Sequence, residues 1–107
     1  MNMISIAREF TPFPGFRFKE YGKGSGEEFR DKFLVPIMEQ GVPVVVELDG
    51  TSGYPSSFLE EAFGGLVRLG YPADRIRKTI QLHASKNFEQ YAKLIDFYIS
   101  KAQAELA

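Results

Sequence analysis

Two adjacent serines at the start of a predicted helix are the residues of this sequence best placed to do chemistry. Ser56 and Ser57 follow the turn-rich loop 49–55, which itself follows the apolar run 42–48. A hydroxyl group at the first turn of a helix caps free backbone N–H groups, and a phosphate group there meets the positive end of the helix dipole. Loops at the carboxyl ends of buried strands are also the usual ligand positions of α/β sheets. The segment therefore predicts either a simple helix cap or a binding or regulatory site.

Other candidate chemistry in the sequence is weaker. The run Gly22-Lys23-Gly24-Ser25-Gly26 has the composition of a phosphate loop, but a Walker loop needs its lysine and hydroxyl residue after the second glycine. The single histidine, His83, alternates with the apolar residues of a predicted strand, so we expect it on the opposite sheet face. The absence of cysteine excludes thiolate nucleophiles, disulfides and cysteine zinc sites. We expect no metal, no cofactor and no enzymatic activity, and an enzyme that uses Asp49 and Ser57 is the weakest alternative.

Length and charge narrow the class of protein further. The 107 residues predict a single domain, residues 1–107, because compact domains usually run to roughly 100–150 residues. A net charge of −1 argues against nucleic acid as a partner, because little would be gained from phosphate counterion release. No apolar run approaches the ~20 residues that span a membrane. The lack of cysteine and of a basic-plus-apolar leader suggests a cytoplasmic location.

The hydrophobic pattern predicts alternating strands and helices. Apolar alternation indicates strands within residues 3–7, 16–19 and 78–84, and the β-branched run 42–48 indicates a central strand covered on both faces. Helices are predicted after Ser25, which forms a capping box with Glu28, after Ser56 or Ser57, and after Asn87. The order is β-β-α-β-α-β-α. We expect an α/β fold with a mixed four-stranded sheet, an antiparallel first hairpin and helices packed mainly on one face.

Two segments of the chain resemble a known family. Glu47-Leu48-Asp49-Gly50 and Ser56-Ser57-Phe58-Leu59 are similar, in layout and spacing, to the central segment of STAS domains, the fold of bacterial anti-sigma-factor antagonists. The resemblance is closer to a STAS-like family of unknown function, over residues 4–66. It includes Ser25-Gly26-Glu27-Glu28-Phe29-Arg30 and the run 57–66, Ser-Phe-Leu-Glu-Glu-Ala-Phe-Gly-Gly-Leu. The resemblance implies a STAS-like fold.

The resemblance also implies regulation through a protein partner rather than catalysis. In STAS antagonists, a histidine-kinase-like ATPase phosphorylates a serine at this helix start and then releases the domain. Ser57 matches that phosphoacceptor, although Pro55 stands in place of the family's aspartate and Phe58 in place of its glycine. The expected partner-binding residues are Asp49, Gly50, Tyr54, Ser56, Phe58, Glu60 and Glu61.

Simpler explanations exist for some of these positions. Asp49 is a residue type that stabilises turns, and carboxylates such as Glu60 and Glu61 favour the first turns of a helix without any partner. A different function is also open. Some STAS relatives bind a small ligand or nucleotide, and the alternative here is a sensing domain that binds one at the carboxyl edge of the sheet.

Overall fold

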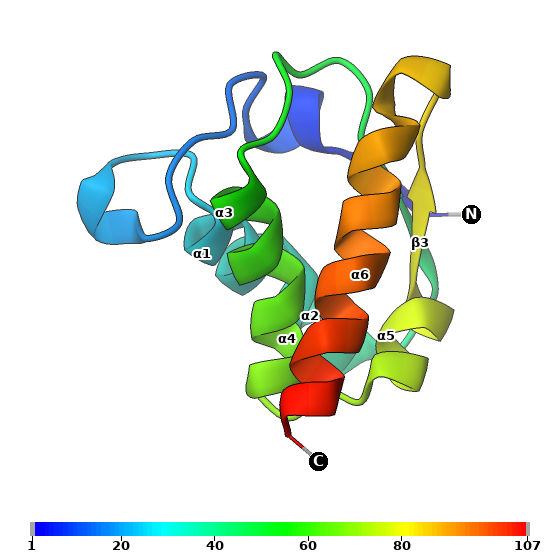
Figure 1. The fold of residues 1–107 in the computed structure, drawn as a ribbon. Coiled ribbons are helices and arrows are strands. Elements are labelled where there is room, and N and C mark those ends of the chain that lie inside the picture. Colours follow the sequence, from blue (N-terminus) through cyan, green and yellow to red (C-terminus); the bar gives the residue numbers. More distant parts are fainter. Residues whose placement is uncertain (1, 107) are drawn as a thin grey trace.

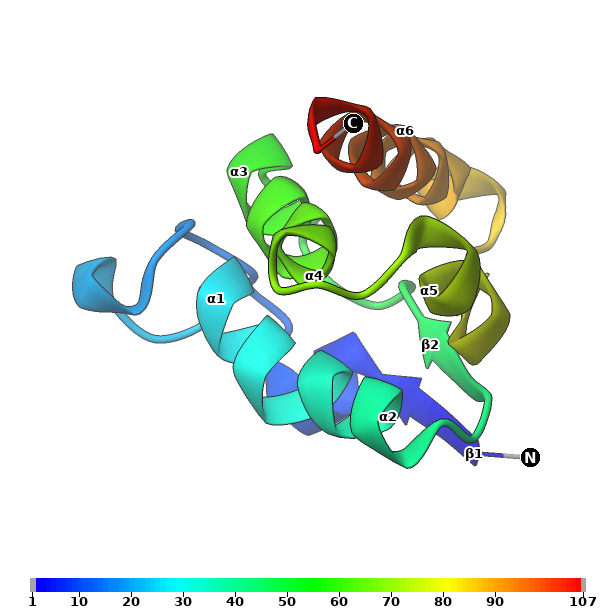
Figure 2. The same cartoon turned by 90° about the horizontal axis from the view of Figure 1, so that it is seen from below.

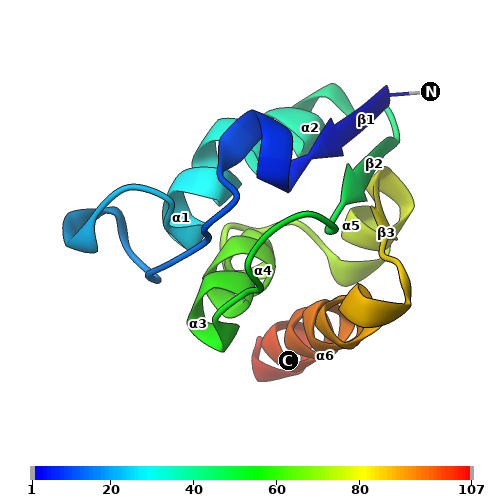
Figure 3. The ribbon, with the colours of Figure 1, turned by 90° about the horizontal axis from the view of Figure 1, so that it is seen from above.

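The sheet is built around β2 (Val44–Glu47), which pairs in parallel with β1 (Asn2–Ser5) on one side and with β3 (Ile80–His83) on the other. The computed structural model describes residues 2–106. Val46 lies opposite Ile4 and Leu82 in the register. Figure 3 shows the three strands on one side of the molecule, with a long loop, residues 11–24, projecting from the other side.

Helices cover one face of this sheet. Val44 and Val46 are buried against them, whereas the side chains that alternate with these, Val45 and Glu47, are only half-buried. The neighbouring strands follow the same alternation, since Gln81 is exposed beside a buried Ile80. The prediction of helices mainly on one face is confirmed. The prediction of a central strand covered on both faces is wrong, because β2 has an apolar run in sequence but presents one side to solvent.

The first long helix runs from Gly26 to Gln40 and comprises α1 (Gly26–Phe29), a π-helical turn (Arg30–Leu34) and α2 (Val35–Gln40). The serine half of the predicted capping box forms, because the Ser25 hydroxyl accepts a hydrogen bond from the Glu28 backbone N–H at 3.0 Å, but the Glu28 carboxylate accepts its bond from the Gly24 N–H instead of the Ser25 N–H. The widened turn ends two residues before Pro36, which has no N–H to donate to the helix ladder. The helix ends at Gly41, whose φ of +72° is the left-handed conformation that glycine adopts most readily.

The second long helix has the same construction, with α3 (Ser56–Leu59), a π-helical turn (Glu60–Gly64) and α4 (Gly65–Arg68). Figure 2 shows it side by side with the first long helix. The predicted serine cap is absent, because Pro55 occupies the capping position and no side chain bonds the first turn. The two helices pack closely at Gly65. The Arg30 side chain crosses Gly65 so closely that a Cβ there would lie 2.7 Å from its Nη1.

The last third of the chain adds α5 (Ala73–Thr79), β3, a 3-10 turn (Lys86–Phe88) and α6 (Glu89–Glu105). Ile95, Ile99 and Ala102 of α6 are buried, and Figure 1 shows this helix running beside α3 and α4. The predicted cap at Asn87 does not form, because a 3-10 turn precedes the helix. No helix within residues 2–106 combines the length and the apolar character needed to cross a membrane.

The predicted strand 16–19 is wrong. The backbone carbonyls of Phe16 and Arg17 accept hydrogen bonds from the N–H groups of Gly26 and Glu27, each at 3.0 Å. These carbonyls therefore satisfy the free donors at the start of α1 and take no part in the sheet. A 3-10 turn, Lys19–Tyr21, follows directly. In the described residues the sheet consequently has three strands and is entirely parallel, not four strands with an antiparallel hairpin.

The contact between the two long helices predicts that Gly26→Ala will be strongly destabilising. A Cβ at Gly26 would lie 2.3 Å from the backbone oxygen of Phe58, so the helices would have to separate. Overpacking of this kind costs about 1–3 kcal/mol and sometimes more. We expect a lower urea midpoint for Gly26→Ala. Gly15→Ala is the matched control, because nothing lies within 4 Å of a Cβ at Gly15. Equal midpoints for the two variants would contradict the close approach.

Candidate functional site

The loop after β2 is fixed to α6 through Tyr54. The Tyr54 hydroxyl donates a hydrogen bond of 2.6 Å to the backbone oxygen of Leu48, and its ring packs against Phe58 and Tyr91. The side chain is buried, and this burial raises the pKa of the phenol well above its ordinary value. Tyr54 is therefore a packing residue that sets the path of the loop, and it presents little surface to a partner.

Asp49 and Gly50 lie at the carboxyl edge of the sheet, as predicted. The Asp49 carboxylate accepts a hydrogen bond of 2.9 Å from the Ser85 backbone N–H, which joins the segments that leave β2 and β3. Gly50 has a φ of +98° and sits against Ala7. The Asp49 side chain thus has a structural role, but the role is a bond between two segments and not the local turn that the sequence predicted, while Gly50 remains exposed.

A hollow of about 480 Å³ opens at the same edge, on the uncovered side of the sheet. Its polar lining comes from Ser5, Arg8, Glu47, Asp49 and Gly50. The Glu47 carboxylate accepts a hydrogen bond of 2.8 Å from Nδ1 of the exposed His83, and this contact raises the pKa of the imidazole. The hollow therefore offers carboxylates and one arginine. Within residues 2–106, no group of three histidine, aspartate or glutamate side chains is arranged to hold a metal ion.

Ser56 and Ser57 occupy the first turn of α3, where Ser56 is exposed and Ser57 is half-buried. Phe58, the next residue, is fully buried in the aromatic core beside Phe29. The family's glycine at this position is thus replaced by a side chain that turns inward and leaves the helix start open. The predicted contact between Phe58 and a partner would require this core residue to move, so its burial favours a packing role.

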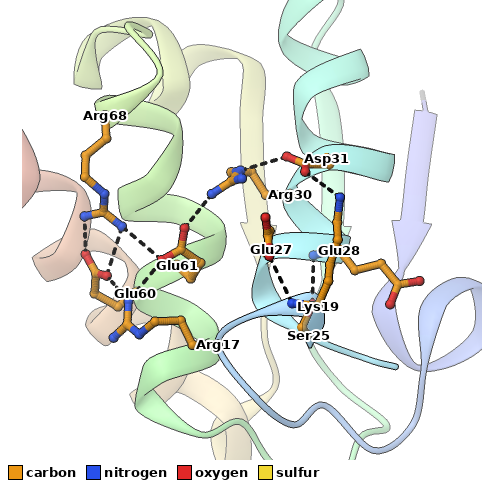
Figure 4. Close-up of polar contacts among 10 residues, drawn as sticks. All are labelled: Arg17, Lys19, Ser25, Glu27, Glu28, Arg30, Asp31, Glu60, Glu61 and Arg68. Atoms are coloured by element: carbon orange, nitrogen blue, oxygen red, sulfur yellow. Dashed lines mark hydrogen bonds and ion pairs between the residues drawn. The ribbon is translucent and has the colours of Figure 1, made fainter. Parts of the chain in front are cut away.

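Glu60 and Glu61 belong to a network of ion pairs that joins the two long helices and the projecting loop (Figure 4). Glu61 accepts hydrogen bonds from Arg30 at 2.6 Å and from Arg17 at 3.2 Å, and only 11% of its side chain is exposed. Glu60 is bonded by Arg68 at 2.7 and 3.0 Å and by Arg17 at 2.5 Å. The hydrogen bonds from Arg68, reinforced by those from Arg17, hold the pKa of Glu60 below its ordinary value.

The same network continues through Arg30. Its Nε donates to Asp31 at 2.9 Å, and Lys19 of the projecting loop donates to the other oxygen of Asp31 at 2.8 Å. The helix-dipole explanation of the two glutamates is therefore incomplete, because Glu60 is paired mainly with Arg68 of the same long helix and Glu61 mainly with Arg30 of the first long helix. Glu61 is mainly a structural residue, and Glu60 keeps a partly exposed edge.

The sequence analysis missed an exposed aromatic group on the projecting loop. We call it the aromatic loop, and its members Phe13, Phe16, Phe18 and Tyr21 are 72%, 49%, 37% and 62% exposed. The loop adjoins the predicted site at both ends, since Arg17 bonds Glu60 and the Pro12 carbonyl accepts a hydrogen bond from Ser52. Clustered exposed aromatic side chains mark interaction surfaces. The signal in the sequence was four aromatic residues within nine positions, of which the strand interpretation took account of only Phe16 and Phe18.

Together these features define a small α/β domain whose serine-bearing helix start lies between an exposed aromatic loop and the carboxyl edge of a half-covered parallel sheet. A family model described as a STAS-like domain of unknown function matches residues 25–89, and the chain belongs to that family. The match covers both long helices, β2, α5 and β3. No curated protein and no solved structure matches the chain.

Proposed function

We propose that this protein is a non-enzymatic regulatory domain that binds a protein partner through the start of α3, the loop after β2 and the aromatic loop. The observation that carries the proposal is the group of four exposed aromatic side chains beside a helix start that the family resemblance associates with partner binding. Aromatic residues supply much of the binding energy at protein interfaces. The contact surface comprises Gly50, Ser56, Ser57 and Glu60 together with the aromatic loop.

We further propose that phosphorylation of Ser57 switches this contact, with a histidine-kinase-like ATPase of the cytoplasm as the partner. Ser57 is half-buried but its helix start is open, so a kinase would meet no bulky neighbour from Phe58. A phosphoserine adds about −1.5 to −2 charge units at neutral pH. Such a charge would be desolvated against a bound partner, which is the physical basis of release.

The aromatic loop provides a direct test of the surface. We expect Phe13→Ser combined with Tyr21→Ser to weaken binding to a purified histidine-kinase-like ATPase from the same genome by about tenfold or more. The thermal midpoint should change little, because both side chains are largely exposed. Isothermal titration calorimetry measures the affinity.

Phe97→Ser is the matched control for that experiment. Phe97 is an aromatic residue of α6 that is 56% exposed and lies outside the proposed surface. The control variant should bind as tightly as the unmodified protein. Undiminished binding by the loop variant, or an equal loss in both variants, would refute the aromatic loop as the contact surface.

The hollow beside Glu47 favours one second candidate, the sensing of a small ligand at the carboxyl edge of the sheet. Its volume of about 480 Å³ and its mixed charges suit a small polar molecule. Thermal shift measurements against nucleotides and phosphorylated metabolites test this candidate. A stabilisation that Glu47→Gln removes would favour sensing, and no stabilisation by any of these compounds would count against it.

A further inference from the structure

The two edges of the three-stranded sheet differ in how they are protected. At the β1 edge, the Ser5 N–H donates a hydrogen bond of 2.7 Å to the Glu9 carboxylate, so a charged side chain covers the end of that strand. At the β3 edge, Ile80–His83 contains no proline, lysine or acidic residue and pairs with β2 without a bulge. Proteins usually protect an exposed edge with such features. In the described residues, β3 is therefore the open edge, at the margin of the molecule in Figure 1.

The backbone of Leu82 carries hydrogen-bonding groups that point away from the sheet. The His83 carbonyl accepts a hydrogen bond of 2.9 Å from the Leu48 N–H, so the backbone groups of His83 face β2. Successive residues of a strand direct these groups to opposite sides, and those of Leu82 therefore point outward. Among residues 2–106, no hydrogen bond to either group is found. The Ile80 N–H, which points the same way, already bonds the Ile76 carbonyl. An added strand would therefore pair around Leu82.

A pocket of about 190 Å³ lies directly beside Leu82, between α5, β3 and α6. Its lining is largely apolar and comes mainly from Phe63, Ile76, Ile80, Leu82, Ile95 and Ile99. Arg77 and Asp96 also line the pocket, and they neutralise each other through a hydrogen bond of 2.9 Å. Leu82 faces the helices, because it lies opposite the buried Val46 in the register. A residue paired with Leu82 in an added strand would direct its side chain to the same face, toward the pocket.

We propose that the β3 edge binds an extended, acidic segment of a partner protein, which adds a fourth strand and inserts one large apolar side chain into the pocket. In this mode of recognition, main-chain hydrogen bonds supply affinity and the pocket supplies specificity. The charge of the edge selects the acidic partner. Exposed Lys78 and Lys86 lie just before and just after β3, and the chain from Arg77 to Lys86 contains no acidic residue. The bound segment therefore carries acidic residues on both sides of its apolar one.

A second copy of the chain fits this edge less well. Pairing of β3 with β3 would bring Ile80 and Leu82 of one copy to the pocket of the other, but these side chains already pack in their own core. The pocket would stay unfilled. The aromatic loop projects from the other side of the molecule (Figure 1), so the β3 edge is separate from the partner surface proposed above and can be tested independently of it.

The test uses the full chain and a fluorescein-labelled probe peptide, Asp-Glu-Thr-Leu-Thr-Glu-Asp. Fluorescence anisotropy measures its affinity, and NMR measures the exchange of individual amide protons with solvent. We expect saturating peptide to slow exchange of the Leu82 N–H by about tenfold or more, because this group gains a hydrogen bond. The Gln81 N–H already faces β2 and is the internal control, whose exchange should not change.

Matched changes in the peptide and in the protein separate the contributions. Methylation of the central leucine nitrogen blocks strand pairing, and replacement of this leucine by alanine leaves the pocket unfilled. Each change should weaken binding by about tenfold or more. Lys86→Glu should weaken it by about threefold to fivefold, because it reverses a charge beside the edge. Lys23→Glu makes the same charge change on the projecting loop and should leave the affinity unchanged.

Slowed exchange at Leu82 together with these losses of affinity supports strand addition. No binding of the probe at about 1 mM, or equal affinities for the leucine and N-methyl-leucine peptides, overturns it. Slow exchange of the Leu82 N–H in a dimer of the protein alone would show that a second copy covers the edge, which overturns it as well.

Discussion

A chain that ends at Ser85 is expected to remain unfolded. This truncation removes α6, whose Ile95 and Ile99 are buried against the long helix that contains Phe63. Full burial of each large apolar side chain contributes about 1.5–3 kcal/mol, whereas a whole domain is stable by only about 5–15 kcal/mol. The loss also uncovers buried residues of the remaining core. We expect circular dichroism of residues 1–85 to show no cooperative thermal transition.

A suitable control for the truncation changes α6 without removing it. Lys93→Ala combined with Lys101→Ala alters two exposed positions of the helix and should leave a cooperative transition close to that of the unmodified protein. A cooperative transition in the truncated chain would mean that the sheet and the two long helices form an independent core. That result would contradict the role assigned here to α6.

Local chemistry allowed part of the fold to be predicted. The helix cap at Ser25 is encoded within four residues, and the helix begins where this serine places it, although the Glu28 carboxylate bonds the Gly24 N–H rather than the Ser25 N–H. The β-branched run around Val46 likewise identified the central strand, although its length was overestimated. The strand predicted at 16–19 failed for a tertiary reason. Apolar and basic residues do alternate over this segment. The carbonyls of Phe16 and Arg17, however, accept hydrogen bonds from the start of α1, and a pattern of side chains does not reveal the hydrogen-bond partners of the backbone.

The location of the candidate site was predicted from the sequence, but the contacts between its side chains were not. The loop at Asp49 and the helix start at Ser57 lie where the pattern placed them, because both depend on the end of one buried strand. The partners of Glu61 could not be read from spacing, since Arg17 and Arg30 are 44 and 31 residues away in the chain. The burial of Phe58 could not be predicted from spacing either. Its ring packs against Phe29 of the first long helix, a segment that lies far away along the chain.

The substitution Ser57→Asp should leave the fold intact and abolish most partner binding. No side chain caps α3, so the serine hydroxyl holds no part of the helix start, and we expect the thermal midpoint to change by only a few degrees. Glu60 and Glu61 lie within one turn, yet both are already paired with arginines. A carboxylate near the positive end of the helix dipole is itself favoured by about 0.3–1 kcal/mol.

The effect on the partner is expected to be much larger, because an unpaired charge desolvated at an interface costs about 2–5 kcal/mol, or about thirtyfold or more in affinity. Calorimetric titration of a histidine-kinase-like ATPase measures this loss. Ser56→Ala is the control, since Ser56 is exposed and its loss adds no charge, and it should change neither stability nor affinity.

If the ATPase binds Ser57→Asp as tightly as the unmodified protein, the helix start is structural and phosphorylation of Ser57 cannot act as the switch. If Ser57→Asp instead unfolds the domain, the half-buried serine belongs to the core.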